Sequence, residues 1–67
     1  MVTDWSEVAR NTLRAEMVRK GVTTAELARR IGEVEKTVAN KISGGKFGAA
    51  WLLMCLAAIG AKRIELD

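Results

Sequence analysis

The sequence predicts an all-α domain of four helices that ends in a short C-terminal β-strand. Three observations support this prediction: the chain of 67 residues has no proline, it is rich in strong helix formers, and glycines divide it into segments of helical length. A chain of this length forms one domain, over residues 1–67, and buries only about 60% of the surface that it exposes when unfolded. Packed helices give such a chain the compact core that it needs.

The first helix is expected over about residues 4–20. Asp4 and Glu7 have the spacing of an N-terminal cap, and Gly21 supplies the left-handed residue that commonly ends a helix. Charged residues such as Arg10 and Glu16 should lie on the wetter side. Apolar residues recur at helical spacing and are expected to face the core: Trp5, Val8, Ala9, Leu13 and Met17.

The second helix is expected over about residues 24–31. Thr23 and Glu26 have the spacing of a capping box, and Gly32 ends the segment. The exposed pair Arg29 and Arg30 is compatible both with a DNA contact and with an ordinary solvated surface. The residues expected to face the core are Leu27, Ala28 and Ile31.

The third helix is expected over about residues 35–43, before Gly44 and Gly45. Its apolar stripe is Val34, Val38 and Ile42, and its polar side carries Glu35, Lys36, Thr37, Asn40 and Lys41. A short helix, a glycine-containing turn and a second helix with a polar outer side form a helix-turn-helix, whose second helix can lie in the DNA major groove. Asparagine can pair with adenine, and lysine can reach guanine or a phosphate. The alternative is that these side chains only keep a surface helix soluble.

The fourth helix is expected over about residues 48–59, with a wide apolar face made of Leu52, Leu53, Leu56 and Ile59. Three short helices cannot cover this face fully, so part of it should be exposed and available for a dimer contact. The alternation after Gly60 predicts a strand over about residues 62–66 that pairs with a second copy of the chain. A docked or frayed tail is the alternative.

Charge favours a polyanionic partner. The chain has a net charge of +3, and the segment from Arg10 to Lys46 contains nine basic residues but only four acidic ones. No histidine is present, and Cys55 is the only cysteine, so we expect neither a zinc site nor a cysteine nucleophile. The longest apolar run, 49–61, falls short of the roughly 20 residues of a membrane span. We therefore expect a cytoplasmic protein, associated with the nucleoid, that is not an enzyme and needs no cofactor.

The run from Gly21 to Gly45 resembles the Xre type of helix-turn-helix, found in lambda-repressor and Cro-like DNA-binding domains. The segment IGAKRIEL resembles the end of the last helix and the short strand with which many of them close. The wider pattern, with LRAEMVRKGV, KISGGKF and CLAAIG, is also similar to a group of small bacterial domains of unassigned function.

The resemblance implies site residues position by position. The base-reading positions fall on Glu35, Lys36, Thr37 and Asn40, and the backbone-contacting positions fall on Thr24, Lys41, Ser43 and Lys46. The chain departs from the family at Ala25, where a glutamine usually holds a phosphate, and in the loop after the third helix.

These expectations describe a regulator that reads double-stranded DNA with its third helix. It would act as a homodimer through the fourth helix and the C-terminal strand, or beside a partner protein. The alternative is a protein-interaction module of helix-turn-helix fold, which docks on RNA polymerase, another regulator or a toxin and does not read DNA directly.

Overall fold

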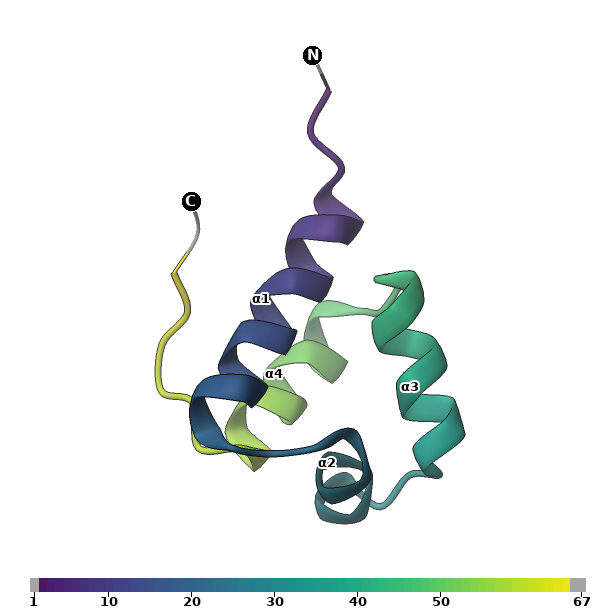
Figure 1. Cartoon of the computed structure of the whole chain (residues 1–67). Helices are drawn as coiled ribbons and strands as arrows, with labels where there is room; N and C mark the ends of the chain where they lie inside the picture. Colours follow the sequence, from purple (N-terminus) through teal and green to yellow (C-terminus); the bar gives the residue numbers. More distant parts are fainter. Residues whose placement is uncertain (1, 66–67) are drawn as a thin grey trace.

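Four helices make up most of the chain in a computed structural model that describes residues 2–65 (Figure 1). They are α1 (Trp5–Lys20), α2 (Thr24–Ile31), α3 (Glu35–Gly44) and α4 (Ala49–Ala58). Each helix begins and ends within about a residue of the position expected from capping and glycine signals, which is the usual uncertainty of a helix boundary.

The predicted C-terminal strand is wrong. Residues 61–65 follow α4 as an irregular segment, and no strand is present between residues 2 and 65. Position 66, where the strand was expected to end, lies outside the described residues. Alternating side chains cannot make a strand alone, because a strand needs a second backbone to take its hydrogen bonds, and residues 2–65 offer none here. The segment instead runs back beside α1 (Figure 1), and residues of both line the same hollow.

Side-chain and glycine caps explain where the helices begin and end. The Asp4 carboxylate accepts hydrogen bonds from the backbone N–H groups of Ser6 and Glu7, and the Thr23 hydroxyl accepts one from Glu26 N–H. Gly21 and Gly32 adopt left-handed backbone conformations directly after α1 and α2, which a side chain would disfavour. These local signals can be read from the sequence.

One residue from each helix is completely buried at the centre of the core. These residues are Leu13, Leu27, Val38 and Cys55. Both α1 and α2 pack against both α3 and α4, so the core lies where the four helices meet. None of the helices within residues 2–65 has the length and apolar character that a bilayer span requires.

Two expected core residues lie on the surface instead. The exposed fractions are 68% for Trp5 and 69% for Val34. Leu53, on the apolar face that was expected to be incompletely covered, is 63% exposed. Trp5 opens α1, whose first turn extends beyond the packed body (Figure 1), so no neighbouring helix covers it. Val34 is the N-cap residue of α3 and has an extended backbone, so its side chain does not continue the apolar stripe of the helix. Glu16, expected on the wetter side, is buried and pairs with Arg19.

Candidate functional site

The second and third helices form a pair joined by the turn 32–34. Glu33 N–H donates to the Ala28 carbonyl at 3.0 Å, which closes the end of α2, and Val38 N–H donates to the Val34 carbonyl at 3.1 Å, which opens α3. Val38 and Ile42 then dock α3 on the core with exposed fractions of 0% and 3%. The opposite side of α3 is left to the solvent.

The expected base-reading residues divide between two sides of α3. Lys36, Thr37 and Asn40 are all exposed, and Lys36 and Asn40, four residues apart, share the side turned away from the core. Glu35 has the spacing of the buried stripe of Val38 and Ile42, and it is exposed because it is the first residue of the helix. Its negative charge therefore lies at the edge of the outward surface, beside the positive end of the helix dipole.

The four expected backbone-contacting residues have different surroundings. Lys46 is exposed and makes no ion pair within residues 2–65. Ser43 is exposed, while its carbonyl accepts a hydrogen bond from Arg10 Nη1 at 3.2 Å. Thr24 is half-buried at the start of α2. Lys41 is half-buried, and it is the one whose charged group forms an ion pair within the protein.

Lys41 belongs to a polar cluster that the sequence did not reveal. Its Nζ lies 3.1 Å from Glu33 Oε1 and 5.0 Å from the centre of the Trp51 ring. Trp51 Nε1 donates to the other carboxylate oxygen of Glu33 at 2.9 Å. The hydrogen bond from Trp51, helped by Lys41, lowers the pKa of Glu33, so this carboxylate stays ionised. We refer to Glu33, Lys41 and Trp51 as the α3–α4 cluster.

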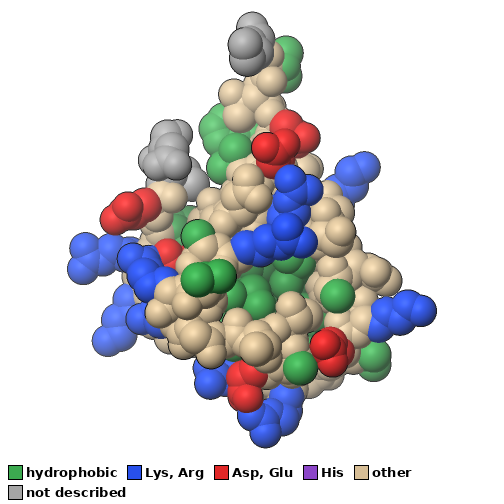
Figure 2. All heavy atoms as spheres, viewed as in Figure 1, with side chains coloured by type: hydrophobic (Ala, Val, Ile, Leu, Met, Phe, Trp, Pro, Cys, Tyr) green, Lys and Arg blue, Asp and Glu red, His purple; other side chains and the backbone are tan. Residues whose placement is uncertain are grey.

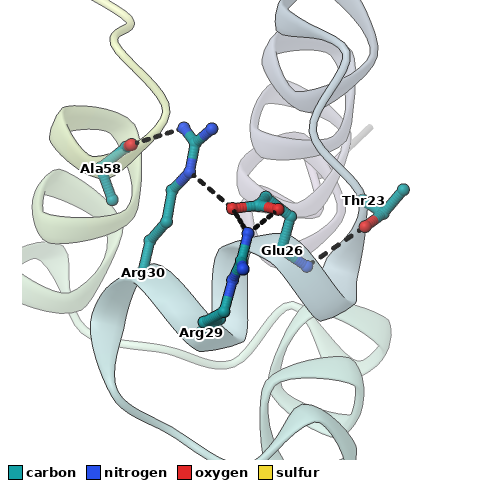
Figure 3. A network of polar contacts seen from close by, with 5 residues as sticks. All are labelled: Thr23, Glu26, Arg29, Arg30 and Ala58. Atoms are coloured by element: carbon teal, nitrogen blue, oxygen red, sulfur yellow. Dashed lines mark hydrogen bonds and ion pairs between the residues drawn. The ribbon is translucent and has the colours of Figure 1, made fainter.

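A second network holds two arginines of α2 (Figure 3). Arg29 and Arg30 both pair with the Glu26 carboxylate, and Arg30 Nη1 also donates to the Ala58 carbonyl at 3.0 Å. The hydrogen bonds from Arg29 and then Arg30 lower the pKa of Glu26. Charge on α2 is thus partly neutralised, and Arg30 ties α2 to the end of α4.

Basic side chains lie in separate patches, with acidic residues between them, on the face that Figure 2 shows. In the view of Figure 2, basic side chains lie at the outer edge over α2, over α3 and around the segment that follows α4. Within residues 2–65, the basic residues that take part in no ion pair are Arg14, Lys20, Lys36, Lys46, Lys62 and Arg63. Two of them, Lys36 and Lys46, lie on α3 and directly after it.

The only cysteine has the surroundings of a core residue. Cys55 is completely buried, and this burial raises the pKa of its thiol to about 11. The thiol is therefore protonated at neutral pH, whereas a cysteine that acts as a nucleophile or a metal ligand must be a thiolate. Within residues 2–65, no group of three or more acidic, cysteine or histidine residues is placed to hold a metal ion.

Comparison with models of protein families matches residues 5–64 to the family described as "Domain of unknown function (DUF6471)". No match was found among the curated proteins or among the solved structures.

Proposed function

We propose that this chain, which belongs to the DUF6471 family, is a sequence-specific regulator that binds double-stranded DNA with α3 in the major groove. One observation carries the proposal. Val38 and Ile42 hold α3 on the core, while Lys36, Thr37 and Asn40 are left exposed on the helix that follows the turn. The proposal retains the resemblance to the Xre type of helix-turn-helix and places the protein in the cytoplasm, on the nucleoid.

Each exposed residue has a distinct role in this proposal. Asn40, which is exposed on the side of α3 opposite the core, would pair with an adenine, and Lys36 would reach a guanine or a phosphate beside it. Thr37 can contact a thymine methyl group or a base edge. Lys46, the Ser43 hydroxyl and Thr24 at the start of α2 are assigned to phosphates, which position the helix but do not read the sequence.

We expect binding to duplex DNA to weaken steeply with salt, because each lysine bound to a phosphate releases counterions. For the Lys46→Gln variant, the slope of log affinity against log salt should become shallower by about 0.9, the effect of one lost phosphate contact. Fluorescence anisotropy with a mixed-sequence duplex of about 20 base pairs, between roughly 50 and 200 mM salt, measures this slope.

Lys62→Gln is the matched control for Lys46→Gln. Lys62 is also exposed and unpaired within residues 2–65, but it lies in the segment after α4, across the molecule from α3 in Figure 1. Its loss should leave the slope nearly unchanged. Equal effects of the two substitutions would show that binding is not centred on α3, and a salt-independent affinity would reject DNA binding altogether.

A protein contact through α4 completes the proposal. The sequence of α4, AAWLLMCLAA, has no charged residue, and its exposed side consists of Ala49, Ala50, Leu53, Met54 and Ala57. Leu53 is 63% exposed and Met54 is 40% exposed. We propose that two copies pair through this side of α4, because a single module of this size binds only one half-site. This dimer does not involve the strand that we had expected.

The Leu53→Glu variant tests this contact. A charge buried in an apolar interface is costly, so the dissociation constant of the dimer should rise by at least about tenfold. Sedimentation equilibrium should show a mass above the 7.3 kDa of one chain for the wild type and a shift toward that mass for the variant. Val18→Glu is the control, because Val18 is a single apolar residue of α1 that is 82% exposed. A wild-type protein of 7.3 kDa at every concentration would exclude the dimer.

The same side of α4 favours one alternative function, a protein-docking module that does not read DNA. In that case the partner would be a different protein that covers Leu53 and Met54. Such a module would show no salt-dependent binding to duplex DNA, and Lys46→Gln would have no effect on its interaction. The duplex titration therefore separates the two functions.

A further inference from the structure

We infer that Lys41 is a positioning residue, which fastens α3 to α4 through Glu33 and Trp51 and does not bind phosphate. This inference rests on the proposed function, because it defines which lysines of the reading helix meet DNA. The resemblance counts Lys41 among the phosphate contacts, together with Lys46.

The cluster joins three parts of the chain that meet beside α3. Lys41 lies on α3, Glu33 in the turn before it, and Trp51 on α4. Both oxygens of the Glu33 carboxylate are used, one by Lys41 at 3.1 Å and the other by the Trp51 N–H at 2.9 Å. The ammonium group also lies 5.0 Å from the centre of the Trp51 ring, within the range of a cation–π interaction.

The cluster supplies a connection that backbone packing does not. Within residues 2–65, the backbone of α3 comes close to the backbones of α1 and α2 but not to that of α4. The N-cap of α3, Val34, also provides no side-chain hydrogen bond. The cluster therefore adds a direct side-chain link between α3 and α4 to the indirect one that both helices have through α1 and α2. Trp51 is itself held by Phe47, whose ring centre lies 5.1 Å away.

Binding a phosphate would require Lys41 to give up these partners. The side chains of Lys41 and Glu33 are 38% and 25% exposed, so their attraction is less screened than that of a fully exposed pair. Moving Lys41 to a phosphate would leave the Glu33 carboxylate without its ion pair. The negative charge of Glu33 would then be repelled by the DNA phosphates. Lys36 and Lys46 make no ion pair within residues 2–65 and carry no such cost.

The experiment uses the double variant Glu33→Gln/Lys41→Gln, which removes the pair without changing the net charge. Its target is a duplex that the wild-type chain selects from a random pool. A positioning role predicts that affinity falls by about threefold or more while the salt slope stays at the wild-type value, because no phosphate contact is lost. Lys46→Gln, measured in parallel, gives the slope change of a true phosphate contact. A slope that becomes shallower by about 0.9 in the double variant, as in Lys46→Gln, would overturn the inference.

Thermal unfolding of the two single variants and the double variant provides a second measurement that needs no DNA. If the residues act as one unit, each single change should lower the Tm by about 4 °C, and the double change should lower it little further. Additive losses, or no losses, would reject the cluster. Should the wild-type chain bind no duplex at any salt concentration, the proposed function would fail, and this cycle would still decide whether Lys41 and Glu33 hold α3.

Discussion

The Gly45→Ala variant is expected to lose most of the stability of the domain, about 2–5 kcal/mol. Gly45 follows α3 with a φ of 66°, in the left-handed region where an alanine is strained. A Cβ atom added there would also overlap the backbone carbonyl oxygen of Ser6. A backbone atom cannot move aside as a side chain can, so α1 and α3 would have to separate.

The same junction holds the C-terminal end of α3 against α1. Gly45 N–H donates to the carbonyls of Lys41 and Ile42, and Arg10 donates to the Ser43 carbonyl from the α1 side. Opening this junction would therefore release the end of α3, and it would also lower the free energy of unfolding. A domain this small seldom has more than about 3–5 kcal/mol from its core, so the variant should be largely unfolded near 37 °C.

Gly44→Ala is the matched control for Gly45→Ala. Gly44 is the last residue of α3, has no positive φ, and has no atom within 4 Å of an added Cβ. Alanine is favoured over glycine in a helix, so this variant should be as stable as the wild type or up to about 1 kcal/mol more stable. Urea unfolding followed by circular dichroism measures both. Equal stabilities of the two variants would contradict the close contact between α1 and α3.

The helices could be predicted because their signals are local. Asp4 and Thr23 cap helices through hydrogen bonds that span three residues or fewer, and Gly21 and Gly32 end helices through their own backbone conformation. The strand could not be predicted in the same way, because its existence depends on a second backbone. Apolar and charged residues alternate near Ile64, but this alternation does not show whether a second strand is available to pair with.

The candidate site could be predicted only in part, for a similar reason. Helical spacing alone placed Lys36 and Asn40 on the side of α3 away from Val38 and Ile42. Spacing could not show that Lys41 forms an ion pair with Glu33 and a cation–π contact with Trp51, because Trp51 comes from another helix. A tryptophan N–H in a half-buried position needs an acceptor, and this requirement was the one available signal. It does not identify Glu33 as that acceptor.

Asn40→Ala is expected to remove sequence preference while leaving the fold intact. Asn40 is exposed opposite the buried stripe of α3, so its loss should change the free energy of unfolding by no more than about 0.5 kcal/mol. A bidentate pair between asparagine and adenine contributes about 1–3 kcal/mol of discrimination, so preference for a selected duplex over a scrambled one should fall by about tenfold to a hundredfold. Affinity for the scrambled duplex should stay nearly constant, since Asn40 carries no charge to hold phosphates.

Asn11→Ala separates base reading from a general effect of losing an amide. Asn11 is also an exposed asparagine on a helix, but it belongs to α1 and lies outside the pair of α2 and α3. Competition between the selected and scrambled duplexes, followed by anisotropy at one fixed salt concentration, gives the preference of each variant. If Asn11→Ala reduces that preference as much as Asn40→Ala does, or if neither changes it, then α3 does not read bases through Asn40. A loss of preference in Asn40→Ala alone would instead show that the side of α3 opposite Val38 and Ile42 recognises the DNA sequence.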